Sequence, residues 1–471
     1  MKPSRFTAGA ATGLTLALAL SACAGGEADN EEPMEPEATQ QEQESTPEES
    51  PDETGMDDGD MENMDEESMD EETTGEETMD EESMDEESSD LSAVMPESTG
   101  DPFADARTAA QHMPMTAATL SSGFASALDI PGDAQSEAAD VRGQLTALFQ
   151  EHVYLAGIGV ATAYQTGPDS QEFELASETL DANSVALADA VGELAGDDAR
   201  ESFLRNWREH IGYFVDYAVA ASEGDQEAMD QAEADLREYT DGVGAFFDRT
   251  TDGELPAESI TESFNGHVDT LTAAIDSMAA GDADAFSNLK MAADHVVEGS
   301  AVMTEGLTAA AGLEGDPSDE ATEVRATLTA GLNEHVYLAS TAVFVAYTEE
   351  EGTDSEAFDA ATQVLDENTV ELADAVGELA GDENREAFLD LWREHIGYFV
   401  DYAEAVAGGD DAAAEEALMN LDQYRQDAGE FFEEISAGEL PADDIAEGLS
   451  MHVQTLSGAI DSLNEALVQN S

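Results

Sequence analysis

The sequence contains a single cysteine, Cys23, in 471 residues. No intrachain disulfide is therefore possible, and the fold must be held together by its apolar core. Positive charge is equally scarce, because 14 Lys and Arg stand against 110 Asp and Glu and give a formal net charge of -96. So acidic a surface repels phosphate groups, which excludes nucleic acid as a partner and favours cations. Salt-adapted proteins share this acid-rich, lysine-poor composition, so adaptation to salt explains part of the charge.

Long apolar runs are also missing beyond the N-terminus, so no later segment is predicted to span a bilayer. Lys2 and Arg5 precede an uncharged apolar run, which predicts a secretory signal over residues 1–22. The sequence Leu20-Ser21-Ala22-Cys23 resembles the lipobox of bacterial lipoproteins. The resemblance implies that Cys23 is lipidated and tethers the protein to the extracytoplasmic face of the cell membrane. The alternative is an ordinary signal peptide with an incidental cysteine.

Residues 23–101 are rich in Asp, Glu and Met, and the string MDEESMDEE occurs twice, at 64–72 and 79–87. High charge with little hydrophobicity does not compensate the entropy of ordering, so this segment is predicted to be a disordered linker. Its self-repulsion would extend it as a stalk. The methionines also suggest a weak Cu(I)-binding role, since thioethers are soft ligands.

From residue 102 onward the chain is a duplication, with repeats at 102–282 and 283–471. WREHIGYFVDYA occurs at 207–218 and 392–403, and EHVYLA at 151–156 and 334–339. The offset between copies grows from 183 to 185 residues, which indicates a two-residue insertion near 349–352 in the second copy. Self-similarity of this kind predicts two copies of one structural unit.

Apolar residues recur at helical spacing through each copy, and Gly, Pro and Asp mark the breaks. We therefore predict an all-α fold, with two tandem antiparallel bundles of about six helices each. In the first copy the helices are expected near 103–128, 138–165, 170–195, 198–222, 226–250 and 257–280.

All eight histidines lie in the repeats and pair across the duplication. Most fall on the apolar face of a predicted helix, and each of the four in a copy lies on a different helix. Bundle cores build metal sites from facing helices, and imidazole suits Zn, Cu, Fe and Ni. We predict one transition-metal site per copy, with Cu or Zn favoured. The candidate ligands are His112, His152, His210 and His267, then His295, His335, His395 and His452.

Other polar residues near these histidines are candidates to hold the second ring nitrogen. Asn183 and Asn368 fall on the apolar face of their helices, and Glu151, Glu209 and Asp294 adjoin histidines in sequence. The competing interpretation is that each histidine is an ordinary hydrogen-bonded core residue. Histidines on separate helices could also lie at different heights and never converge.

The EHVYLA and WREHIGYFVDY segments resemble a helical domain of exported Gram-positive proteins, some of which carry a copper amine oxidase label. The resemblance implies a secreted bundle, but the label does not fit. A copper amine oxidase needs an Asn-Tyr motif and a His-x-His pair, and this sequence contains neither. With no other catalytic motif present, the sequence favours a lipid-anchored metal-binding protein. The alternative is a metal-free spacer or partner-binding module with structural histidines.

Overall fold

The computed structural model describes residues 91–469, and this part of the chain is helical with no β-strand. The predicted all-α bundle is therefore confirmed. The predicted signal sequence, Cys23 and the acidic segment up to residue 90 lie outside the described residues. The helices are α1 (Pro102–Gln111), α2 (Met113–Leu128), α3 (Glu137–Thr166), α4 (Gln171–Ala195), α5 (Asp197–Glu223), α6 (Gln226–Thr250), α7 (Ala257–Ala280), α8 (Ala285–Ala311), α9 (Glu320–Thr348), α10 (Glu356–Ala380), α11 (Asp382–Gly408), α12 (Asp411–Ile435) and α13 (Ala442–Asn464). Short helical turns lie at Leu91–Ala93 (η1), Gly352–Asp354 (η2) and Glu465–Gln469 (η3).

The helix ends repeat between the two copies. Ser170 caps α4 through its side chain, which accepts from the backbone N–H of Phe173, and Ser355 caps α10 in the same way. Gly224 and Gly409 end α5 and α11 with φ values of 68° and 66°, a left-handed conformation that glycine adopts without strain. Such matched boundaries keep equivalent residues at equivalent heights in the two copies.

The helix expected at 103–128 is broken into α1 and α2 at His112. Pro114 follows two residues later, and a proline cannot donate the backbone hydrogen bond that a continuous helix requires. The equivalent segment of the second copy has no proline and forms the uninterrupted helix α8. The predicted single helix is therefore wrong in the first copy.

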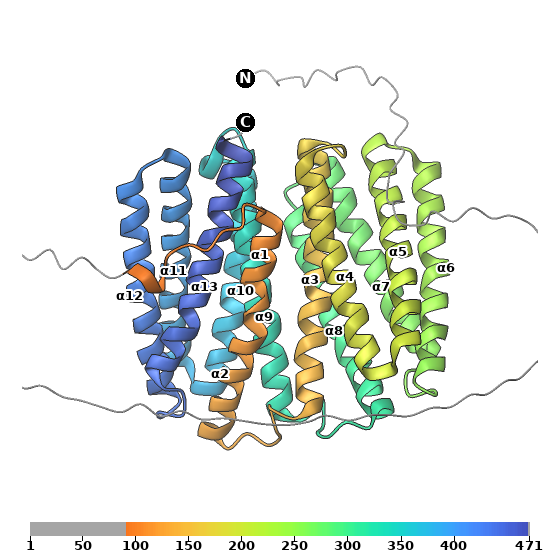
Figure 1. Cartoon of the computed structure of the whole chain (residues 1–471), viewed down its shortest axis with the longest axis horizontal. Helices are drawn as coiled ribbons and strands as arrows, with labels where there is room; N and C mark the ends of the chain where they lie inside the picture. Colours follow the sequence, from red (N-terminus) through yellow and green to blue (C-terminus); the bar gives the residue numbers. More distant parts are fainter. Residues whose placement is uncertain (1–90, 470–471) are drawn as a thin grey trace, which may run out of the picture. The chain divides into compact units, whose positions relative to one another are not determined.

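The first helical segment of each copy packs among helices of the other copy. α8 lies against α3 and α7, whereas α1 lies against α13 and α2 against α9 (Figure 1). Close approaches confirm the exchange, because there is no room for a side chain at Gly123 beside Leu440, or at Gly306 beside Leu255. We therefore distinguish a first bundle, α3 to α8, and a second bundle, α9 to α13 with α1 and α2.

The two bundles meet along α3 and α9, which pack directly against each other. The boundary at residue 282 separates the sequence copies, yet it falls between α7 and α8, which also pack together. The repeats in the sequence and the bundles in the structure are therefore offset by one helical segment.

Among residues 91–469, no helix combines the length and the hydropathy that crossing a bilayer requires.

Candidate metal centre

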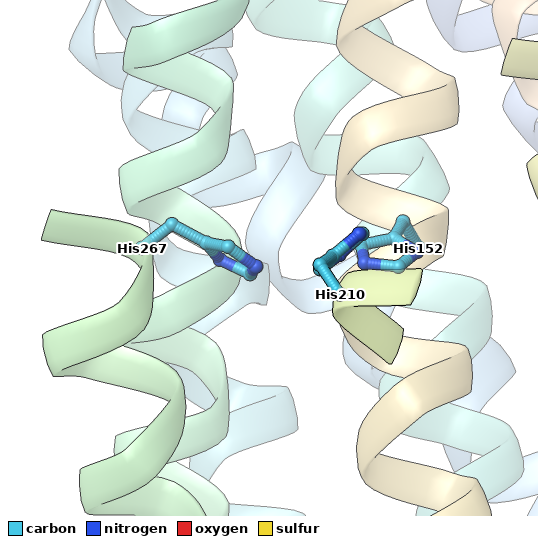
Figure 2. Close-up of side chains that lie close together, drawn as sticks. All are labelled: His152, His210 and His267. Carbon is cyan, nitrogen blue, oxygen red and sulfur yellow. The ribbon is translucent and has the colours of Figure 1, made fainter. Parts of the chain in front are cut away.

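Three helices of the first bundle bring one imidazole each to a common point. The ring nitrogens of His152 on α3, His210 on α5 and His267 on α7 lie within 4.8 Å of one another. Figure 2 shows His152 and His210 together, with His267 reaching toward them from the opposite side. All three residues are buried, with at most 5% of their surface exposed. We call this set the first triad.

The second bundle contains an equivalent set, the second triad, formed by His335 on α9, His395 on α11 and His452 on α13. Its members are also buried, and their ring nitrogens again lie within 4.8 Å of one another. Nε2 of His395 and Nε2 of His335 are 3.3 Å apart, so one ring can donate a hydrogen bond to the other.

Aromatic side chains fix the ring planes. His210 stacks on Tyr239 with 4.8 Å between ring centroids, and His395 stacks on Tyr424 at 4.5 Å. Trp207 and Trp392 precede these histidines by one turn and contact them edge-on. The WREHIGYFVDYA repeat therefore places an imidazole and the tryptophan that contacts it on one helix face, while α6 or α12 supplies the stacking tyrosine.

Most ring nitrogens of the triads have no hydrogen-bond partner among the described residues. In the first triad these are Nδ1 of His152 and both nitrogens of His210 and His267. In the second they are Nδ1 of His335 and His395 and both nitrogens of His452. An unsatisfied buried polar group costs about 1–3 kcal/mol, so an apolar core would be more stable without these residues. Metal coordination would satisfy one nitrogen of each ring.

Burial keeps the imidazoles neutral, which is the form that binds metals. It lowers the pKa of His152 to about 4 and, together with the neighbouring histidines, that of His267 to about 3. In the second triad burial lowers the pKa of His335 to about 3 and that of His452 to about 4. The pKa values of His210 and His395 fall well below the usual range for the same reason, reinforced by the other triad members. Protons therefore do not compete for these ligands near neutral pH.

His112 and His295 lie outside the triads, so three of the four candidate ligands of each copy converge and one does not. His295 is half-buried, and its Nε2 lies 2.9 Å from the backbone oxygen of Ser263. Both still act at short range on a triad: His295 lowers the pKa of His267, and His112 lowers that of His452. Because of the helix exchange, the two histidines of each such pair come from different sequence copies. His295 belongs to the second copy and affects the first triad, whereas His112 belongs to the first copy and affects the second triad.

Asn183 and Asn368 are fully buried, as expected from their position on the helix. The Asn183 amide donates to the backbone oxygen of Leu148 at 3.0 Å and to Glu151 at 2.9 Å. Its Oδ1 is buried and without a partner, like Nδ1 of His152, and its side chain opposes the effect of burial on the pKa of that histidine. Asn368 makes the equivalent bonds to Gly331 and Glu334. The Asn183 amide therefore connects the first triad with a buried glutamate, and Asn368 holds the equivalent glutamate of the second bundle.

The two glutamates belong to a polar cluster at the contact between α3 and α9. Tyr154 donates to Glu334 at 2.7 Å, Tyr337 donates to Glu151 at 3.1 Å, and the two phenol rings stack 5.4 Å apart. A cation pairs with each carboxylate: Arg107 with Glu151 at 2.7 Å, and Lys290 with Glu334 at 3.3 Å. We call these six residues the interface cluster.

The interface cluster was not predicted from the sequence, although two signals pointed to it. The Glu and Tyr of EHVYLA repeat as faithfully as its His, and Lys290 is one of only two lysines in the chain. The other acids named as neighbours of histidines do not face the triads. Glu209 accepts an exposed hydrogen bond from Tyr213, and Asp294 pairs with Lys290.

No protein-family model, curated protein or solved structure matches this chain. The resemblance to a helical domain of exported Gram-positive proteins therefore stays a prediction, and the site geometry carries the functional argument.

Proposed function

We propose that this protein binds two transition-metal ions, one in each triad, at the extracytoplasmic face of a membrane to which Cys23 anchors it. The observation that carries the metal assignment is the convergence of three buried imidazoles in each bundle, with most of their ring nitrogens unpartnered. A single core histidine is commonly satisfied by a neighbouring backbone or hydroxyl group. Six of them gathered in two equivalent triads, largely without such partners, fit ligands better than packing residues.

The geometry suits a small divalent ion. Zinc–nitrogen bonds are about 2.0–2.1 Å, so tetrahedral ligand nitrogens lie about 3.3 Å apart. The Nε2 atoms of His335 and His395 already have this 3.3 Å separation, and in each triad one nitrogen of every ring lies within 4.8 Å of the others. Ring rotations that shift a nitrogen by about 1 Å bring the remaining nitrogens to the separation that a zinc ion requires. Neutral imidazoles without a thiolate favour copper or zinc, and three of them leave one coordination position for water or another ligand.

The location is inferred from the sequence. The lipobox-like Leu20–Cys23 and the preceding apolar run support export and lipidation, and the acidic segment after Cys23 would separate the helical body from the membrane. The membrane, reached through the lipid, and metal cations are thus the proposed partners, and the acidic surface argues against nucleic acid. A Cys23→Ser variant should leave the membrane fraction and lose incorporation of labelled fatty acid. Unchanged membrane association of this variant would refute the anchor.

Metal binding is tested on the full mature chain after chelation and dialysis. Titration with Zn(II) or Cu(II), followed by elemental analysis, should give two ions per chain. His210→Ala should retain one ion, His395→Ala should retain one, and the double variant should bind none with comparable affinity. Circular dichroism confirms folding, and the intact site of each single variant serves as an internal control.

His112→Ala is the matched control, because it removes a histidine near a triad without removing a member of it. It should keep two ions per chain. Failure of the parent chain to bind either metal, or binding that the double variant retains in full, would contradict the assignment. The first of these results would favour the metal-free module.

A further inference from the structure

A cavity of about 390 Å³ adjoins the second triad. His335 is among the residues that line it, and this buried side chain is only 1% exposed, with no partner for Nδ1. The cavity recorded beside the first triad is only about 20 Å³. Small-molecule sites usually measure about 300–1,000 Å³, so the larger cavity has the size of a ligand site and the smaller one does not.

The cavity walls are apolar and partly aromatic. They come from α9, α10, α11 and α13, and include Tyr347, Phe358, Leu365, Phe399 and Ile460. Tyr347 is tied to the wall because its hydroxyl donates to the backbone oxygen of Ala403 at 2.8 Å. Such walls favour a flat apolar body, since aromatic rings pack well against one another.

The cavity also has an acidic part that is specific to the second copy. Glu349, Glu350, Glu351 and Glu404 contribute to its lining, and the first three lie at the two-residue insertion before η2. The first copy has Thr166 and Gly167 around the insertion point and Val219 in place of Glu404. Glu350, Glu351 and Glu404 are exposed to solvent. Four carboxylates at an opening repel anions, while neutral molecules and cations pass.

We propose that the metal in the second triad binds a neutral, flat nitrogen-donor molecule of the imidazole or pyridine class in this cavity. The inference rests on the proposed metal site, because the donor nitrogen would occupy the coordination position that three histidines leave open. The apolar walls hold the body of the ligand, and the acidic lining excludes anionic ligands that would otherwise compete. The first triad, beside its smaller cavity, holds metal without admitting such a molecule.

The test uses the full mature chain loaded with Co(II), whose visible spectrum reports changes in its ligands. His210→Ala keeps only the second site, and His395→Ala keeps only the first. 4-Methylimidazole is the neutral probe and azide the anionic probe. The second-site protein should show a saturable spectral change with 4-methylimidazole, with an affinity at least tenfold above that of the first-site protein. At low ionic strength azide should bind at least tenfold more weakly than 4-methylimidazole.

Two further variants separate the parts of the proposal. Glu350→Gln combined with Glu351→Gln and Glu404→Gln should strengthen azide binding severalfold and change 4-methylimidazole binding little. Ala346→Phe fills the cavity and should abolish the response to 4-methylimidazole while Co(II) remains bound.

The outcomes distinguish this inference from the proposed function. If His210→Ala is folded but binds no Co(II), the metal site itself fails and the cavity proposal falls with it. If Co(II) binds but its spectrum is insensitive to 4-methylimidazole, or responds equally in both sites, only the cavity proposal is overturned. An unchanged response in Ala346→Phe would overturn it as well.

Discussion

Acid should destabilise the metal-free protein in a pH range where most carboxylates are still ionised. The six triad histidines are buried, and burial lowers the pKa of each below its ordinary value of 6.5, to about 4 for His152 and about 3 for His267. In the unfolded chain the same residues titrate near 6.5. Between pH 6.5 and 5.5 the unfolded chain therefore takes up protons that the folded chain excludes.

The sign and the size of the effect follow from this difference. Since the folded pKa values are depressed, the stabilisation is fully present above pH 6.5 and is lost as the pH falls. Each histidine loses about 1 kcal/mol over this interval, and six lose about 6 kcal/mol. Glu334 acts in the opposite direction, because burial raises its pKa to about 7 and the folded protein takes up its proton first. Over the same interval this adds about 1 kcal/mol to the free energy of unfolding. The net loss of about 5 kcal/mol is comparable with the whole stability of a typical domain.

The assay is urea unfolding in the presence of a chelator at pH 6.5 and 5.5. Trp207 and Trp392 pack against the triads, so their fluorescence reports the relevant cores. His112→Gln should reduce the pH effect less, because this residue is only half-buried although burial lowers its pKa too, whereas His152→Gln should reduce it by about 1 kcal/mol. A loss below about 2 kcal/mol in the parent chain would show that the triads are not buried and neutral as described.

Three further predictions concern the cluster between the bundles, the helix exchange and the bound metal. Tyr154→Phe removes a 2.7 Å hydrogen bond to buried Glu334 and should cost about 2 kcal/mol in urea unfolding, against about 0.5 kcal/mol or less for Tyr213→Phe, which removes an exposed hydrogen bond; equal losses would contradict the role of the cluster. Because bundles and repeats are offset, a fragment spanning 135–313 should be more helical and more cooperative in thermal unfolding than one spanning 102–282, and the reverse order would refute the exchange. In the folded protein, protons compete with metal for the histidine ligands only near pH 4. The affinity for Zn(II) should therefore change less than about threefold between pH 7.5 and 5.5 while the protein stays folded. A hundredfold loss of affinity in a competition titration would be incompatible with the pKa values.

Much of the fold follows from local sequence. The 3.6-residue periodicity and the Gly, Pro and Asp breaks located the helices to within a few residues, because each helix buries one face and ends at a residue that favours turns. The burial of the triad histidines followed from the same periodicity, since His210 is spaced one turn from both Trp207 and Phe214 on the buried face of α5. Pro114 was the local signal for the break that the apolar pattern concealed.

The helix exchange could not be derived in this way. The segments 102–128 and 285–311 are equivalent in the duplication, and each is followed by a connection of eight residues, 129–136 or 312–319. Periodicity identifies the buried face of a helix but not which of two equivalent bundles covers it. Only long-range packing, such as Gly123 against Leu440, distinguishes the two arrangements. The same ambiguity led to His112 being grouped with the triad of its own copy.

Helical geometry also explains why EHVYLA serves two purposes. Glu151 and Tyr154 are about 100° and 200° around α3 from His152, so neither can share its direction. His152 therefore points into the first triad while Glu151 and Tyr154 meet α9. Because α9 carries the same motif, each bundle supplies a tyrosine hydroxyl that donates to the glutamate of the other bundle. Each also supplies a glutamate that accepts from the tyrosine of the other bundle.

This arrangement predicts that the two metal sites are coupled. Metal binding at His152 orders α3, and α3 holds Tyr337 of α9 through Glu151, two positions along from His335. A second ion then orders a helix that is already partly restrained, which gives positive cooperativity. Typical coupling energies of about 1–3 kcal/mol correspond to fivefold or more in affinity. The second site should therefore bind Zn(II) at least fivefold more tightly in the parent chain than in His210→Ala, where the first site is absent. Replacing both Tyr154 and Tyr337 by Phe should reduce that ratio toward one, and equal affinities in the parent chain and His210→Ala would show that the interface cluster supports the fold without connecting the sites.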